Sequence, residues 1–136
     1  MIQGKRSWIQ IRREADTVRA VMETKRMANS LGFDNYHSQK VATAVSELVR
    51  NIIKYADSGE VIIAPIYRAN RTGIEVTVKD RGAGIADIDR AMQDDFSSSG
   101  TLGMGLPGVK RLMDEFEISS EVNVGTEALI LALPNN

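Results

Sequence analysis

An acidic residue followed by two closely spaced glycines ends a predicted strand in the middle of this chain. Ile74, Val76 and Val78 alternate with other residues, which is typical of a strand with one buried face. The strand stops at Asp80-Arg81-Gly82-Ala83-Gly84, and glycine is favoured where a backbone turns sharply or approaches another group closely. Asp80 would then lie at the mouth of a sheet, where its carboxylate could accept a hydrogen bond from a flat heterocyclic amine. Taken alone, the stretch fits a tight turn with a solvated aspartate equally well.

The composition is that of one ordinary globular domain, which we expect to span residues 1–136. The chain is 43% hydrophobic and 26% charged, with a net charge of -1 and the two signs interspersed. This pattern lacks the concentrated basic face that nucleic-acid binding requires. The absence of cysteine excludes disulfides and thiolate sites. No apolar run approaches the length of a transmembrane helix, so we expect no membrane partner and a cytoplasmic location.

The first quarter of the chain predicts a strand and a helix. Residues 7–12 alternate around two isoleucines. Asp16 is a suitable N-cap for the helix that follows, and Gly32 is a suitable stop. Apolar residues at helical spacing predict its buried face: Val18, Val21, Met22, Ala28 and Leu31.

A second helix, predicted after a loop at residues 33–37, carries the first candidate catalytic residues. Ser38 is its expected N-cap. Its predicted buried stripe comprises Val41, Ala44, Val45, Leu48, Ile52 and Tyr55. Glu47 and Asn51 are four residues apart, so they share a face that adjoins this stripe. An amide oxygen suits Mg²⁺, and a carboxylate can orient or deprotonate a nucleophile, although exposed helical pairs of this kind are also common.

The rest of the chain predicts more strands and a short helix at residues 87–92. The expected strands are 60–67, 74–79, 116–122 and 127–133. Turns are expected at residues 70–73 and 123–125, and Pro65 should mark a sheet edge or a bulge. The hydroxyl of Thr126, at the start of the last strand, could reach the same ligand as Asp80. A β-branched residue in a hairpin is the alternative for Thr126.

Residues 94–105 are small, polar and rich in glycine, which predicts a mobile loop. The loop runs directly into a helix that has Pro107 in its first turn, where proline is tolerated. Such a junction can bind an anion, because free N–H groups coincide with the positive end of the helix dipole. Gly103 and Gly105 would let the backbone approach phosphates.

Four short motifs, in this order, resemble the ATP-binding pocket of the gyrase, Hsp90, histidine-kinase and MutL superfamily. They are Glu47-x-x-x-Asn51, Asp80-x-Gly82-x-Gly84, Gly103-x-Gly105 and Gly125-Thr126. They correspond to the N box, the G1 box, the G2 box at the end of the ATP lid, and the terminal Gly-Thr. The resemblance implies an α+β two-layer sandwich, in which helices cover one face of a mixed, mostly antiparallel sheet. It also implies that ATP and Mg²⁺ bind between the helices and the lid.

The resemblance further implies a role for each matched residue of the first two motifs. Glu47 matches the general base of the family, and Asn51 matches its magnesium ligand. Asp80 matches the acceptor of the adenine amino group. Gly82 and Gly84 match the glycines that shape this wall of the pocket.

The two later motifs match the phosphate-facing end of the lid and a second adenine contact. Gly103 and Gly105 belong to the lid, and Thr126 to the adenine contact. The chain departs from the related anti-sigma kinases at residues 96–105, which contain no Lys or Arg where those kinases carry a basic residue that reaches the γ-phosphate. Three basic residues elsewhere could supply that charge: Lys54, Lys110 and Arg111.

Within the superfamily the chain is similar to the small bacterial serine/threonine switch kinases, which lack dimerising histidine helices. The run from Phe96 to Phe116 is most like that of the stressosome kinases. This resemblance implies phosphorylation of serine or threonine on STAS-domain partners, after which the released kinase can activate a phosphatase of the PP2C type. Two alternatives share the same pocket: an anti-sigma factor with kinase activity toward an anti-anti-sigma factor, and a non-enzymatic ATP-gated binding module.

Overall fold

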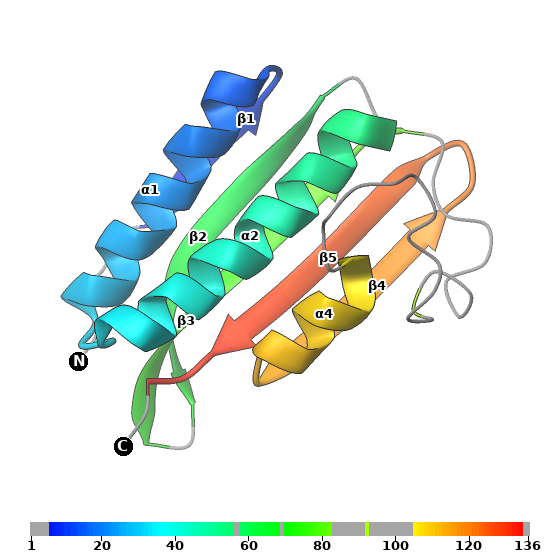
Figure 1. Ribbon diagram of the computed structural model, residues 1–136. Coiled ribbons are helices and arrows are strands. Elements are labelled where there is room, and N and C mark those ends of the chain that lie inside the picture. Colours follow the sequence, from blue (N-terminus) through cyan, green and yellow to red (C-terminus); the bar gives the residue numbers. More distant parts are fainter. Residues whose placement is uncertain (1–5, 56–57, 69, 83–91, 93–104, 135–136) are drawn as a thin grey trace.

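The computed structural model describes residues 6–55, 58–68, 70–82, 92 and 105–134. Within these residues, three helices cover one face of a five-stranded sheet (Figure 1). The elements in chain order are β1 (Ser7–Ile11), α1 (Glu14–Ser30), α2 (Asn35–Tyr55), β2 (Gly59–Arg68), β3 (Arg71–Asp80), α4 (Gly105–Leu112), β4 (Glu115–Glu121) and β5 (Gly125–Ala132). The predicted two-layer α+β class is therefore confirmed.

The sheet has the strand order β1-β2-β3-β5-β4 and is antiparallel at every described pair, so no parallel pair of the expected mixed sheet occurs there. β3 is the central strand, and it pairs with β2 and β5 along most of its length. At the end of β3, Lys79 lies opposite Glu127. This register brings Asp80 beside the start of β5.

The hydrophobic core lies between the helices and the sheet. Alternate residues of β2 and β3 face the helices, as expected for strands with one buried face. Four residues of the predicted α2 stripe are buried there: Val41, Ala44, Val45 and Leu48. The side chains of Ile52 and Tyr55 lie outside the described part of the structure. Because this stripe packs against the core, it sets the rotation of α2 about its axis. The orientation of the face that carries Glu47 and Asn51 is set in the same way.

The predicted buried face of α1 is only partly correct, because Ala28 is buried and Leu31 packs partly buried against the core, but other predicted residues are exposed. Val18 and Met22 are 57% and 65% exposed, whereas the buried residues are Ala20, Thr24, Met27 and Ala28. The helix begins at Glu14, so Asp16 lies within the first turn and is not the N-cap. Its carboxylate reaches back to accept hydrogen bonds from the N–H groups of Arg12 and Arg13, at 2.9 and 3.2 Å. The bond from Arg12 is the main reason why the pKa of Asp16 lies below its ordinary value.

The predicted start of α2 is also wrong, because Asp34 caps the helix in place of Ser38. The Oδ1 atom of Asp34 accepts a hydrogen bond of 2.7 Å from the N–H of His37. Ser38 is buried inside the first turn, and its hydroxyl donates to the carbonyl of Asn35 at 3.2 Å. Aspartate and serine are comparable N-caps, so sequence preference alone did not distinguish the two positions.

The strand boundaries agree with expectation except at one turn. Gly73 lies inside β3, and the residue with left-handed backbone at this turn is Asn70, with φ of 62°. Described pairing between β1 and β2 ends at Ile63, and the residue that this register would place opposite Pro65 lies outside the described part of the structure. The edge or bulge expected at Pro65 therefore stays a prediction. Of the short helix expected at residues 87–92, all but the last residue lie outside the described part of the structure.

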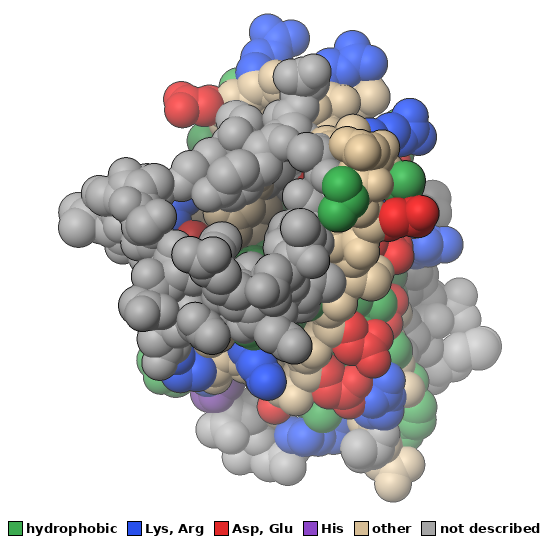
Figure 2. All heavy atoms as spheres, turned by 90° about the vertical axis from the view of Figure 1, so that its right-hand side faces the viewer, with side chains coloured by type: hydrophobic (Ala, Val, Ile, Leu, Met, Phe, Trp, Pro, Cys, Tyr) green, Lys and Arg blue, Asp and Glu red, His purple; other side chains and the backbone are tan. Residues whose placement is uncertain are grey.

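Among the described residues on the face shown in Figure 2, Lys and Arg side chains are interspersed with Asp and Glu side chains. This agrees with the net charge of -1. None of the described helices has the length and apolar character that crossing a membrane would require.

Glu23 fastens α1 to β1, which leads to a prediction about stability and pH. Its carboxylate accepts hydrogen bonds from Arg26 Nε at 2.8 Å and from the Ser7 hydroxyl at 2.6 Å. The Arg26 guanidinium, helped by Ser7 and opposed by burial, lowers the pKa of Glu23 from 4.5 to about 2. Because the folded-state pKa is depressed, the ionised group stabilises the fold fully above pH 4.5, and this contribution is lost as the pH falls toward 2.

We therefore expect Glu23→Gln to destabilise the protein near neutral pH and to cost progressively less in acid. Urea unfolding of the parent and the variant between pH 7 and pH 3 would measure the difference in free energy of unfolding. A difference that stays constant over this range would contradict the assigned pKa shift.

Candidate functional site

Ends of four elements meet at one side of the sheet, and they carry most of the predicted site residues. The second half of α2 supplies Glu47 and Asn51, and the end of β3 supplies Asp80, followed by Gly82. The start of α4 supplies Gly105, and the start of β5 supplies Thr126. Hydrogen bonds join Asp80 to Thr126 and Glu47 to Gly105. Gly84 and Gly103 lie outside the described residues, so their placement stays a prediction.

Asp80 is held in one orientation by two backbone donors. Its Oδ1 atom accepts from the N–H of Gly82 at 2.9 Å and from the N–H of Thr126 at 3.2 Å. Both bonds go to the same oxygen, so Oδ2 takes part in neither. A carboxylate fixed through one oxygen can offer the other as an acceptor to a ligand. Asp80 is only partly buried, which fits an acceptor that a ligand can reach.

Gly125 and Thr126 approach Asp80 very closely. Gly125 has φ of +143°, and a Cβ atom at this position would lie 2.1 Å from the carbonyl oxygen of Asp80. The hydroxyl of Thr126 shares a hydrogen bond of 2.8 Å with the hydroxyl of Ser120, which also donates to the carbonyl of Gly125 at 3.1 Å. Sequence reasoning missed Ser120. The hairpin register could have revealed it, because Ser120 lies directly opposite Thr126.

Glu47 connects α2 to the N-terminus of α4. Its Oε2 atom accepts a hydrogen bond of 3.2 Å from the N–H of Gly105, the first residue of α4. Its Oε1 atom forms an ion pair with the guanidinium of Arg50. The Glu47 side chain is only 10% exposed. Asn51, one turn further along α2, is partly buried.

The N–H of Gly105, at the N-terminus of α4, donates a hydrogen bond to a carboxylate oxygen of Glu47. Gly105 has φ of 69°, a conformation that glycine adopts without strain. A helix N-terminus that already holds a carboxylate oxygen also suits a phosphate oxygen.

The described residues contain no cluster of side chains that could hold a metal ion by themselves. No group of three or more His, Asp or Glu residues in that part of the chain could hold a metal ion. Mg²⁺ is commonly bound through one or two protein oxygens together with substrate phosphates and water. The amide oxygen of Asn51, one turn of α2 from Glu47, is an oxygen ligand of the kind that suits Mg²⁺ arriving with a nucleotide.

Two of the three basic residues proposed to replace a lid cation lie away from the N-terminus of α4. Lys110 and Arg111 lie in the last turn of α4, at the end opposite Gly105. The side chain of Lys54 lies outside the described part. The cation that does contact Glu47 is Arg50, which sequence reasoning missed. Its spacing of three residues from Glu47 was the available signal.

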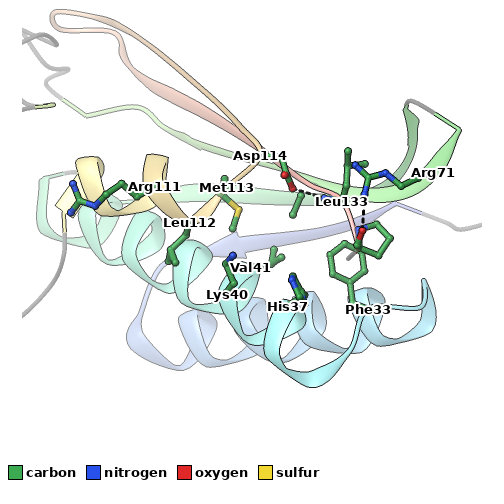
Figure 3. Close-up of a pocket in the computed structure, with 12 residues that line it drawn as sticks. Phe33, His37, Lys40, Val41, Arg71, Arg111, Leu112, Met113, Asp114 and Leu133 are labelled. Carbon is green, nitrogen blue, oxygen red and sulfur yellow. Dashed lines mark hydrogen bonds between the residues drawn. The ribbon is translucent and has the colours of Figure 1, made fainter. Parts of the chain in front are cut away.

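A cavity of about 210 Å³ lies elsewhere, between the first turns of α2, the end of α4 and the end of β5 (Figure 3). It contains none of the predicted site residues, and its polar lining includes His37, Lys40, Arg71, Arg111 and Asp114. Arg71 donates to the carbonyl of Pro134 at 2.9 Å, and Asp114 accepts from the N–H of Leu133 at 2.8 Å. These two bonds fasten the C-terminal segment to the fold.

Comparison with known proteins gives the class of this chain. Residues 11–131 match the family model of the histidine kinase-like ATPase domain. The chain therefore belongs to the histidine kinase-like ATPase family, as its four motifs suggested. Within that family it is a protein serine/threonine kinase, because it is 44% identical over 121 residues to the serine/threonine-protein kinase RsbT of Bacillus subtilis, covering 89% of this chain and 91% of that protein.

Further relatives and solved structures agree with this placement. The chain is 37% identical over 94 residues to the anti-sigma F factor of Geobacillus thermodenitrificans, covering 64% of this chain and 63% of that protein. The fold matches the RsbU and RsbW domains of a Mycobacterium tuberculosis protein, with a TM-score of 0.69 and 16% identity over 98% of this chain and 34% of that one. It also matches the mycobacterial sensor histidine kinase MprB, with a TM-score of 0.55 and 18% identity over 95% of this chain and 97% of that one. At such low identities the two structures bear on the fold alone.

Proposed function

We propose that this kinase transfers the γ-phosphate of Mg-ATP to a serine or threonine of a STAS-domain partner in a cytoplasmic partner-switching pathway. The observation that carries the proposal is the contact between the Glu47 carboxylate and the N-terminus of α4. This contact supports a role for Glu47 as a proton acceptor near a helix N-terminus that could hold phosphate. The relatives named RsbT and anti-sigma F factor support a partner-switching kinase as the broader class.

The side chains of this site have separate tasks in the proposed reaction. Asp80 accepts from the adenine amino group through Oδ2, and the N–H of Gly105 stabilises phosphate charge. Asn51 contributes an oxygen ligand to Mg²⁺, which neutralises charge on the phosphates when it is bound. Glu47 takes the proton of the substrate hydroxyl while the hydroxyl oxygen bonds to the γ-phosphorus. The bond from that phosphorus to the bridging oxygen breaks, and ADP leaves with its electrons.

Two other functions use the same pocket and can be separated by their partners. The similarity to anti-sigma F factor favours an anti-sigma factor with kinase activity as the second candidate. Such a protein would bind a sigma factor in addition to phosphorylating its antagonist. An ATP-gated binding module would bind nucleotide and transfer no phosphate. In a switching pathway, a PP2C-type phosphatase would be the partner of the released kinase.

The decisive experiment incubates the purified protein with γ-labelled ATP, Mg²⁺ and purified STAS-domain proteins, and maps the modified residue by mass spectrometry. We expect label on one serine or threonine of a STAS-domain protein, and none when Glu47→Gln replaces the parent. Co-purification of this protein with a sigma factor in the presence of ATP and Mg²⁺ would favour the anti-sigma alternative. Nucleotide binding without any labelled protein would overturn the proposal.

The proposed adenine contact predicts a loss of nucleotide affinity in Asp80→Asn. The amide oxygen of asparagine can keep the two bonds that Oδ1 accepts, but its NH₂ group would then replace Oδ2 and face the adenine amine as a second donor. Affinity for ATP should therefore fall by about 1–3 kcal/mol, the scale of a hydrogen bond to a charged group. Calorimetric titration with Mg-ATP measures this loss. Unchanged affinity in a folded Asp80→Asn protein would contradict the assignment.

A further inference from the structure

The ion pair between Arg50 and Glu47 differs from an ordinary pair on a helix surface. The Glu47 side chain is 10% exposed, whereas that of Arg50 is 48% exposed. A largely buried carboxylate needs partners that compensate for the water it has lost. Among the described residues, Glu47 has the Arg50 guanidinium as partner of Oε1 and the N–H of Gly105 as partner of Oε2.

If a nucleotide binds at this site, Glu47 can lose one of these two contacts and keep the other. A phosphate oxygen at the N-terminus of α4 would compete with Glu47 for the N–H of Gly105, because both are anions on one donor. Arg50 would then be the described partner that still holds the carboxylate.

We propose that Arg50 is a positioning residue for phosphate transfer, because its guanidinium holds one oxygen of Glu47 and turns the other toward the N-terminus of α4. This inference rests on the proposed role of Glu47 as general base. Arg50 acts through Glu47 and does not itself contact the transferred phosphate.

The chain offers a matched control in Arg26, which pairs with Glu23 at the same spacing of three residues along α1. That pair is more exposed, with side chains 65% and 23% exposed. α2 lies between α1 and α4, so the pair is remote from the N-terminus of α4 (Figure 1). Arg26→Met therefore removes a similar ion pair without touching the site.

The test is a double-mutant cycle that combines Arg50→Met with Glu47→Gln, measured as the single-turnover rate of phosphate transfer to the labelled STAS-domain protein. Arg50→Met alone should slow transfer by ~10–100-fold, because a misplaced base loses much of its effect. Its affinity for Mg-ATP should stay within about three-fold of the parent, since it leaves the nucleotide contacts intact.

Arg50→Lys should restore part of the rate of transfer, and Arg26→Met should leave that rate unchanged. In the Glu47→Gln background, Arg50→Met should change the rate by less than about two-fold, because residues that act as one unit are not additive.

A second measurement needs no partner protein. The amide resonance of Gly105 in the nucleotide-free protein should move in Arg50→Met and in Glu47→Gln, and stay in place in Arg26→Met. Parental transfer by Arg50→Met would overturn the proposal while leaving Glu47 as the base, provided that Glu47→Gln is impaired. A full additional loss in the Glu47→Gln background would also overturn it, because Arg50 would then act directly on phosphate. Parental transfer by Glu47→Gln would instead contradict the role of Glu47 itself.

Discussion

Glu47→Gln should lose phosphate transfer by ~10²–10⁴-fold, the usual scale for a positioned general base, while keeping its affinity for Mg-ATP within a few-fold. The carboxylate lies beside the N-terminus of α4, where it accepts from the N–H of Gly105. A carboxylate gains little by approaching a triphosphate, because like charges repel. Its value to the enzyme must come from the substrate hydroxyl, whose proton it can accept. Glutamine keeps the size and the acceptor oxygen of this side chain, but it cannot take that proton.

Asn51 provides the comparison that separates binding from chemistry. It lies one helical turn from Glu47 on the same face of α2. As a ligand of Mg²⁺ it would serve both nucleotide binding and transfer. Asn51→Ala should therefore lose magnesium-dependent nucleotide affinity as well as transfer, whereas Glu47→Gln should lose transfer alone.

Paired measurements on the two variants test this difference. Calorimetry gives the affinity for Mg-ATP, and single-turnover labelling gives the rate of transfer to a STAS-domain protein. Transfer at the parental rate by Glu47→Gln would show that Glu47 is not the base. Equal losses of affinity in both variants would show that the two residues act together in binding nucleotide.

The position of the candidate site could be predicted from the sequence because three of its four motifs stand at the end of an element. Asp80 ends β3, Gly105 begins α4, and Thr126 follows the first residue of β5. The polarity pattern fixes where strands and helices end, and a sheet brings the ends of antiparallel neighbours together. The sequence therefore indicated that these residues lie close together, while their roles in binding and catalysis remain predictions.

The errors arose where several residues were equally good candidates for one position. On α1, Met22 has the apolar character of a core residue, but the packing of the helix leaves it 65% exposed and buries Thr24. Thr24 satisfies its hydroxyl by donating to the carbonyl of Ala20 at 2.8 Å, which removes the cost of burying it. At the start of α2, Asp34 and Ser38 were both suitable caps, and tertiary packing selected the aspartate.

Arg50 was missed for a different reason. An arginine three residues after a glutamate is usually one more charge on a solvated helix face. The meaning of this pair depends on the N-terminus of α4, which lies 58 residues away along the chain at Gly105. Only the folded arrangement shows that one end of the ion pair is largely buried.

The close approach of Gly125 to Asp80 gives the largest expected effect on stability. Gly125→Ala would place a Cβ atom 2.1 Å from the carbonyl oxygen of Asp80 and 3.0 Å from the Cα of Arg81. Both are backbone atoms, so no flexible side chain can move aside. The backbone at Gly125 also has φ of +143°, which side chains rarely tolerate. To relieve the overlap, β5 must separate from β3 where Asp80 accepts from the N–H of Thr126.

Gly125→Ala should therefore lower the free energy of unfolding by roughly 2–4 kcal/mol, through backbone strain and a broken strand pair, and it should also weaken nucleotide binding. Gly32→Ala is the matched control, because Gly32 also has positive φ, at +94°, but no atom lies within 4 Å of the added Cβ. That variant should lose only about 1 kcal/mol from the left-handed backbone alone and keep its affinity for ATP. Urea unfolding and calorimetry on both proteins measure the two quantities. Similar stability losses, with ATP affinity intact in both, would mean that the contact between Gly125 and Asp80 does not shape the adenine wall.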